Sequence, residues 1–237
     1  MKFYQNFRQM DIVIALGTGS RWMDNELRYA LRSIETYLEG YGDILLVGEK
    51  PKWIQNVKHY DIPDVPGRKN FSIFQKILTG CEWVNGNDFI FWNDDHFLLK
   101  PFHVKQFKYW YDGDCWEWSH KATGLYQRAT TNTNNLPGKN NYYTDIHVPI
   151  VYNKHLFANL LKLDWKQEYI IKSAYTKQID GPFELMADFK INKWYSVNEW
   201  KGKLQNRIFF SIGSYAVNAD FKILMQELYP NKSKNEK

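Results

Sequence analysis

The sequence contains few cysteines and no long apolar segment. Its 237 residues include only Cys81 and Cys115, too few for a disulfide framework or a four-ligand zinc site and typical of a reducing compartment. No apolar run approaches the roughly 20 residues that span a bilayer. Residues 1–8 also lack the apolar region of a signal peptide. These absences predict a globular, soluble protein in the cytoplasm, with no membrane span.

Two common nucleotide-binding motifs are also incomplete. The segment Leu16-Gly17-Thr18-Gly19-Ser20 lacks the Gly-Lys-Ser/Thr ending of a phosphate loop and the third glycine of a dinucleotide fingerprint. Its backbone N–H groups could nevertheless approach a nucleotide, because glycine leaves the main chain exposed. The alternative is a plain turn, which is an equally common use of paired glycines.

The composition allows a substantial core and does not specify a partner. Hydrophobic residues make up 44% of the chain, enough for one large domain. The formal net charge of +5 and the pI near 8.9 permit a polyanionic partner but serve solubility equally well. The 10 Trp, 16 Tyr and 15 Phe suit sugar rings or bases, although large aromatic residues are more often core.

The first hundred residues alternate between strand and helix patterns. Apolar runs predict strands over 11–16, 43–48, 57–62 and 89–92. Apolar residues at three- and four-residue spacing predict a helix from a cap at Asp24 or Asn25 to near Gly40, and a second helix over 71–83. This alternation indicates an α/β fold with a mostly parallel sheet and helices on both of its faces.

The second half is less regular. Residues 145–152 predict a strand that Pro149 restricts to an edge. Helices are expected over 154–163 and 166–178, and the polar, Asn-rich residues 128–143 suggest a mobile loop. The lysine-rich residues 231–237 suggest a disordered tail. No repeat or linker divides the chain, so we expect a single domain over 1–230.

The most informative segment is Asn93-Asp94-Asp95, which directly follows a continuous apolar run. Two adjacent carboxylates at the end of a buried strand repel each other unless a positive charge relieves them. Magnesium and manganese take oxygen ligands and often share them with substrate phosphates. Open α/β sheets place their ligand crevice at this edge. The alternative is a turn, since Asn and Asp also close strands.

These residues carry a resemblance to a known family. The segments Asp24 to Glu35, Pro51 to Ile54 and Asn93 to Phe97 resemble the central region of the Stealth family of sugar-phosphate transferases in both order and spacing. Residues 11–13 are similar to the first strand of that family, and His147-Val148-Pro149 followed by Lys154 resembles its later histidine segment. The resemblance covers about residues 11 to 155.

The resemblance implies a glycosyltransferase-A-like fold, with a nucleotide-sugar-binding half over 11–100 and an acceptor half over 101–230. It implies that Asn93 and Asp94 contact the donor diphosphate, that Asp94 and Asp95 hold Mn²⁺ or Mg²⁺, and that a UDP-sugar is the favoured donor. The family transfers a sugar phosphate with the help of a later arginine. Residues 171–175 contain no arginine, and their one cation, Lys172, cannot form two parallel hydrogen bonds to a phosphate as arginine does. Transfer of the sugar itself to a hydroxyl is therefore favoured, with sugar-1-phosphate transfer as the alternative.

The remaining candidate residues fall into two groups. His147 could be the acceptor base or a third metal ligand, and it could equally be a hydrogen-bonded structural residue. Asp180 and Glu184 lie in a plausible acceptor loop and could serve as the base. Cations near the predicted sheet edge could contact the donor, although a solvated face is the commoner role for any one of them. They are Arg21, Arg68 and Lys69.

The acceptor and the class of the protein have alternatives at this level. The acceptor could be a glycan or hydroxymethylated phage DNA, and the sequence predicts no oligomeric state. A hypothesis of a different class is a non-catalytic module that binds nucleic acid or glycan through the basic and aromatic residues 105–118.

Overall fold

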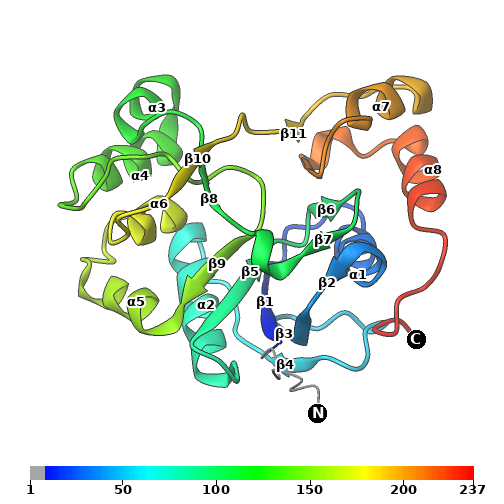
Figure 1. Cartoon of the computed structure of the whole chain (residues 1–237), viewed down its shortest axis with the longest axis horizontal. Coiled ribbons are helices and arrows are strands. Elements are labelled where there is room, and N and C mark those ends of the chain that lie inside the picture. The colour runs from blue at the N-terminus through cyan, green and yellow to red at the C-terminus, as the bar shows by residue number, and fades with distance from the viewer. Residues whose placement is uncertain (1–8) are drawn as a thin grey trace, which may run out of the picture.

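A five-stranded sheet forms the centre of the molecule in the computed structural model, which describes residues 9–237 (Figure 1). The predicted absence of a signal peptide at residues 1–8 lies outside the described residues. The strand order is β4-β3-β1-β5-β9, and all neighbouring strands are parallel except β9, which runs antiparallel to β5. The bounds are β1 Met10–Leu16, β3 Tyr41–Gly48, β4 Lys58–Tyr60, β5 Asp88–Trp92 and β9 Ile150–Asn153. Since β9 pairs with β5 alone within residues 9–237, the edge position that Pro149 predicts is confirmed.

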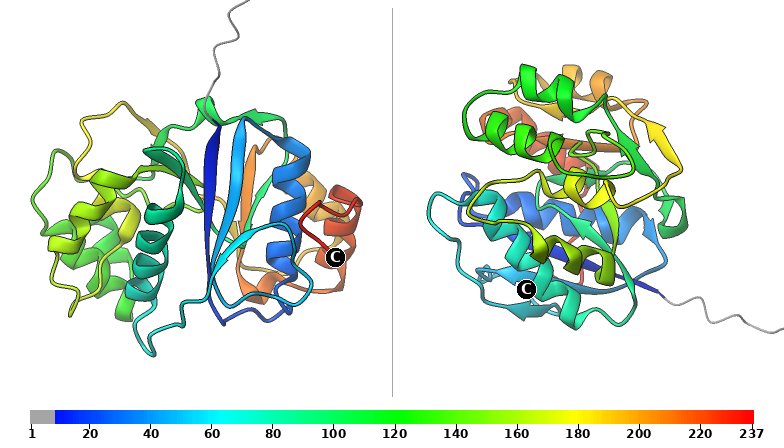
Figure 2. Two further views of the ribbon diagram at one scale, coloured as in Figure 1. Left: turned by 90° about the horizontal axis from the view of Figure 1, so that it is seen from below. Right: turned by 90° about the vertical axis from the view of Figure 1, so that its left-hand side faces the viewer.

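The two long helices cover opposite faces of this sheet, as the left view of Figure 2 shows. Alternate residues of β1 point to different cores, because side chains alternate along a strand. Ile12 and Ile14 share a core with Leu27 and Leu31 of α1 (Asn25–Tyr37). Val13 on the other side packs in a core with α2 (Lys69–Trp83). The mostly parallel α/β sheet with helices on both faces is thus confirmed.

The chain after β5 forms smaller elements on both sides of the central sheet. One group lies beside α2 and comprises β8 Tyr109–Tyr111, α3 Cys115–Lys121, α4 Gly124–Asn134, α5 Lys154–Ala158, α6 Ile171–Thr176 and β10 Phe183–Leu185. The other lies beside α1 and comprises β6 His96–Leu98, β11 Lys190–Ile191, α7 Val197–Leu204, β12 Phe209–Ile212 and α8 Ala219–Leu228. Two short strands, β2 Leu38–Glu39 and β7 Phe102–His103, pair with each other. Figure 1 shows the segment between β10 and β11 crossing from one group to the other.

Several elements differ from the sequence prediction. Residues 128–143, expected as a mobile loop, contain most of α4, because Ala129, Thr130 and Thr133 are buried against the rest of the chain. The helix expected over 166–178 is restricted to α6. Residues 154–163 are helical as predicted, with α5 followed by a 3₁₀ turn over Asn159–Lys162.

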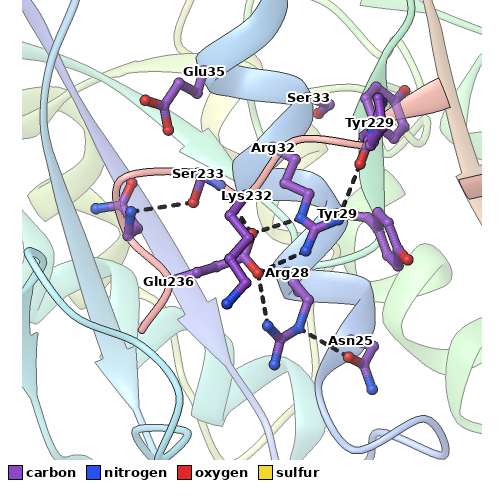
Figure 3. A network of polar contacts seen from close by, with 12 residues as sticks. Asn25, Arg28, Tyr29, Arg32, Ser33, Glu35, Tyr229, Lys232, Ser233 and Glu236 are labelled. Atoms are coloured by element: carbon purple, nitrogen blue, oxygen red, sulfur yellow. Dashed lines mark hydrogen bonds and ion pairs between the residues drawn. The ribbon is translucent and has the colours of Figure 1, made fainter. Parts of the chain in front are cut away.

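The last residues also differ from the prediction, since they pack on α1 instead of forming a disordered tail. Glu236 is buried, and its carboxylate accepts hydrogen bonds from Arg28 at 2.7 Å and from Arg32 at 2.6 and 2.9 Å (Figure 3). The main chain also bonds the loop before β4, through Gln55 N–H to the carbonyl of Asn235 at 2.8 Å. A buried ion-pair network thus holds a polar segment that composition alone predicts to be free.

Within residues 9–237, the helices are all too short or too polar to cross a bilayer. This finding agrees with the absence of long apolar runs in the sequence.

Candidate active site

The polar residues that follow β1 and β5 lie at one edge of the central sheet. The two strands run parallel with Ile12 opposite Ile90 and Ile14 opposite Trp92, so their carboxyl ends are neighbours. β9 runs antiparallel with Ile150 opposite Phe91, which places the start of β9 at the same edge. The chain therefore brings the segments around Ser20, Asp94 and His147 to one place.

Asp94 lies among other carboxylates. Burial raises the pKa of Asp94 to about 7, and the charges of Asp95, Glu26 and Asp24 add to the effect. Burial also raises the pKa of Glu26, although a hydrogen bond of 2.8 Å from the Ser20 hydroxyl opposes this shift. This edge of the sheet thus carries negative charge that the fold leaves partly uncompensated.

The first turn of α1 contributes to this charge through an unusual backbone. Asp24 precedes the helix in a left-handed conformation with φ of 57°, and its side chain makes no capping hydrogen bond, contrary to the predicted cap. Instead, the Ser20 hydroxyl oxygen accepts the N–H groups of Trp22 at 3.1 Å and Asp24 at 2.8 Å. The Asp24 carboxylate therefore remains available at the site, where burial and Glu49 raise its pKa.

The two acids of the motif have different partners. Asp95 accepts from Lys190 Nζ at 3.1 Å and lies 3.7 Å from His96 Nε2. Among residues 9–237, Asp94 has no lysine, arginine or histidine within ion-pair distance. Asp94 is consequently the carboxylate best suited to a cation from solution.

The residues present fit a metal ion that shares its ligands with a substrate. Nowhere in the described part of the chain do three His, Cys, Asp or Glu side chains converge as a ready-made metal site. Asp94 and Asp95 nevertheless supply the hard oxygen ligands that Mg²⁺ and Mn²⁺ prefer, in a place where negative charge is unrelieved. One or two carboxylates together with substrate phosphates is a common arrangement for such ions.

His147 is held in place by an acid that the sequence analysis missed. Its Nδ1 lies 2.6 Å from Asp188 Oδ2, and its backbone N–H donates to Asp188 Oδ1 at 2.8 Å. Burial raises the pKa of Asp188, but the bonds with His147 outweigh it and hold that pKa below the ordinary value. A carboxylate on Nδ1 fixes the tautomer that leaves Nε2 as an acceptor, as a base or a metal ligand requires.

Lys172 fixes the chain on either side of His147. Its buried Nζ donates to the carbonyls of Ile146 and Val148, both at 2.7 Å. Burial lowers the pKa of Lys172, and the charges of Asp145, Asp188 and Asp95 oppose that shift. Lys172 is therefore committed to the backbone and is not the exposed cation that could replace an arginine of the Stealth pattern.

His96 has a supporting position beside the acids. It is buried, and burial together with the nearby charge of Lys172 lowers its pKa well below the usual range, so its ring is neutral. Its Nε2 lies 3.3 Å from the amide nitrogen of Asn93. The ring thus orients Asn93 within the motif.

A cavity of about 680 Å³ opens next to the loop after β1 and the start of α2, and this loop follows the strand that neighbours β5 in the sheet. Five of the residues predicted to contact the donor line it, namely Gly17, Thr18, Gly19, Arg68 and Lys69. Leu125 and Tyr126 at the start of α4 also line it. Its volume lies within the range of small-molecule sites.

A buried lysine keeps the glycine loop in shape. Lys76 Nζ donates to the carbonyl of Leu16 at 2.6 Å and to Asp64 Oδ1 at 2.5 Å. The other oxygen of Asp64 accepts the backbone N–H of Thr18 at 3.0 Å and its hydroxyl at 3.2 Å. The pKa of Asp64 is lowered, because these bonds outweigh the opposing effect of burial.

Four predicted residues lie elsewhere or have other partners. Leu16 is buried and borders a smaller cavity of about 120 Å³, and Arg21 stacks 4.6 Å from the ring centre of Tyr215. Asp180 and Glu184 form exposed ion pairs with Lys139 and Lys108. The hydrogen bonds of these two acids do not join them to His147, and their catalytic role stays a prediction.

The residues that the sequence analysis missed are Asp188, Lys190, Asp64, Lys76 and Tyr126. Lys76 carried a usable signal, because a lysine within the apolar face of a predicted helix implies a buried partner. Asp188 and Lys190 lie in a segment with no regular pattern, far along the chain from the acids and histidine that they contact. Their role depends on the tertiary fold.

Comparisons with known proteins find similarity in structure and none in sequence. No protein-family model matches the chain, and no curated protein sequence matches it. The inositol-1-phosphate CTP transferase from T. maritima is similar at a TM-score of 0.52 and 10% identity, over 95% of this chain and 98% of that one. This chain shares its fold.

Two glycosyltransferase structures also match. The galactosyltransferase LgtC in complex with donor and acceptor sugar analogues has a TM-score of 0.45 at 12% identity, over 89% of this chain and 85% of that one. A glycosyltransferase involved in glycosylation of the major capsid of PBCV-1 has a TM-score of 0.44 at 10% identity, over 94% of this chain and all of that one.

Proposed function

We propose that this protein is a metal-dependent glycosyltransferase, which moves a sugar from a nucleotide-sugar donor to a hydroxyl acceptor. The observation that carries the proposal is the position of two features at one edge of the central sheet: the cavity lined by the glycine loop after β1, and Asp94 after β5, a partly buried carboxylate that has no cationic partner among residues 9–237. A nucleotide diphosphate with a divalent cation would fill the cavity and relieve this charge. The fold shared with a CTP transferase supports the use of a nucleotide substrate.

The residues of the chain have separate tasks in this proposal. Asp94 and Asp95 hold Mg²⁺ or Mn²⁺, which when bound neutralises the charge that develops on the leaving diphosphate. The backbone of Gly17 to Gly19, with Arg68 and Lys69, faces the nucleotide in the cavity. A UDP-sugar remains the favoured donor.

His147 is the proposed base. Its Nε2 accepts the proton of the acceptor hydroxyl as the acceptor oxygen bonds the anomeric carbon of the sugar, and the bond from that carbon to the diphosphate breaks. Asp188 stabilises the imidazolium that forms, because its carboxylate lies 2.6 Å from Nδ1. The nucleoside diphosphate leaves.

Transfer of a sugar 1-phosphate is the second candidate, which the Stealth-like segments favour. In that reaction the acceptor oxygen bonds the sugar-bearing phosphorus, the bond from this phosphorus to the bridging oxygen of the diphosphate breaks, and a nucleoside monophosphate leaves. The commitment of Lys172 to backbone carbonyls weighs against it, because no cation is then available at that position for the transferred phosphate. Cytoplasmic residence stays a prediction that the small number of cysteines supports.

The test is an incubation with a panel of nucleotide sugars and hydroxyl acceptors, with and without Mn²⁺, analysed by mass. We expect a product heavier by one sugar residue, release of nucleoside diphosphate, and no product after chelation. Release of monophosphate alone would identify the second candidate. If no donor binds, and binding to an oligonucleotide weakens steeply with salt, the protein is a non-catalytic module.

A further inference from the structure

Two highly exposed aromatic side chains lie side by side near the candidate site. Trp194 is 72% exposed and Tyr215 is 67% exposed, which is unusual for residues that normally bury their rings. The indole N–H of Trp194 donates to the backbone carbonyl of Tyr215. This pair, called the aromatic platform below, is a built feature and not two unrelated surface residues.

The main chain beneath the platform is firmly fixed. Trp194 follows β11, Tyr215 follows β12, and these strands pair in parallel with Ile191 opposite Ile212. The N–H of Gly213 extends the pairing by donating to the carbonyl of Ile191 at 2.8 Å. A Cβ at Gly213 would clash with Asn192 Oδ1, so glycine at this position makes room for the Asn192 side chain against the loop after β12.

Three connections link the chain segments that carry the platform to the candidate site. Lys190, four residues before Trp194, donates to Asp95. Ser211, four residues before Tyr215, pairs across the sheet with His96. Arg21 stacks on the ring of Tyr215 and follows Ser20, whose hydroxyl bonds Glu26. The strands and the loop that position the acids therefore also position the platform.

We propose that the aromatic platform is the acceptor subsite and that it binds an uncharged carbohydrate chain. This inference rests on the proposed transferase function and names its acceptor class. The C–H face of a sugar ring stacks on an aromatic face, and the platform offers two largely exposed rings, that of Tyr215 with Arg21 on one of its faces. Arg21 contributes hydrogen-bond donors for sugar hydroxyls.

Charge favours a neutral glycan over nucleic acid. Lys190 and Ser211, on the two strands that carry the platform, contact Asp95 and pair with His96, so a chain bound on the platform would lead toward the acids of the candidate site. A phosphate backbone led along these acids would add negative charge where it is least tolerated. An uncharged sugar chain meets no such repulsion.

The test measures binding of uncharged hexasaccharides of glucose, mannose and N-acetylglucosamine, and of the single strand dT12, to the full chain by calorimetry. At least one hexasaccharide should bind, and Trp194→Ala and Tyr215→Ala should each weaken it about tenfold, the loss expected from one aromatic contact. Trp83→Ala is the matched control, because Trp83 is also exposed but lies at the end of α2, where its ring contacts Tyr60. It should bind like the parent protein.

The inference is overturned if no hexasaccharide binds, if the platform variants bind as tightly as Trp83→Ala, or if only dT12 binds. Binding of nucleotide sugars to the same variants separates this inference from the proposed function. Donor binding without a platform effect refutes the subsite alone. A platform effect on hexasaccharides without donor binding refutes the transferase and leaves a carbohydrate-binding site.

Discussion

Replacing Glu236 by Gln should destabilise the protein strongly, although the residue lies far from the candidate site. The Glu236 side chain is fully buried, and it pairs with Arg32, which is 7% exposed, and with the more accessible Arg28. The substitution removes the only carboxylate that both guanidinium groups contact in Figure 3. Loss of one partner from a buried ion pair costs about 3 to 5 kcal/mol, because the remaining charge stays desolvated. Glutamine keeps one oxygen acceptor, so we expect about 3 kcal/mol.

Urea denaturation followed by tryptophan fluorescence measures this effect. With a slope of about 3 kcal/mol per molar urea for a chain of this size, the midpoint should fall by about 1 M. Glu227→Gln is the matched control, because Glu227 pairs with Lys201 while the two side chains are 46% and 54% exposed. Exposed pairs contribute less than about 1 kcal/mol. Equal midpoints for the two variants would refute the view that the last residues form a buried strap on α1.

Three further predictions concern pH, His147 and the glycine loop. The hydrogen bonds to Arg32 and Arg28 outweigh burial and hold the pKa of Glu236 below its ordinary 4.5. The difference in unfolding free energy between the parent and Glu236→Gln should therefore be complete above pH 4.5 and vanish as the pH falls through the folded-state pKa. A difference that persists at pH 2 contradicts this. Lys172→Met should leave two buried carbonyls without a donor, cost about 2 to 6 kcal/mol in urea denaturation and lower the turnover number more than donor affinity. Asp64→Asn should weaken the Lys76 contact and raise the KM for the donor severalfold with little change in turnover, whereas a change in turnover alone would place Asp64 at the reacting bond.

The strand and helix pattern of the first hundred residues was predictable because it depends on local periodicity. Continuous apolar runs become buried parallel strands, and β1 and β5 lie where those runs predict. The position of Asp94 at the carboxyl end of β5 follows directly. The position of the glycine loop was predictable in the same way, because the loop directly follows β1 and so lies at the carboxyl edge of the sheet.

The second half was harder to predict because its contacts are between segments distant in sequence. The partner of His147 is 41 residues away, in an irregular segment whose course depends on β8 and β10. The composition of the tail around Glu236 predicts disorder. Its burial depends on contacts with Arg32 and Arg28, which are 204 and 208 residues away in the sequence. At Asp24 a local signal is present but fails. The sequence predicts a helix cap there, whereas the Ser20 hydroxyl accepts the backbone N–H groups of this turn.

Donor binding to Asp94→Asn tests the central claim most directly. The parent protein should bind a nucleotide sugar in calorimetry only when Mn²⁺ or Mg²⁺ is present. Asp94→Asn should lose this metal-dependent binding while its denaturation midpoint is equal to or above that of the parent, because the substitution removes charge repulsion without a change in volume. Unchanged, metal-dependent donor binding by Asp94→Asn would contradict the account.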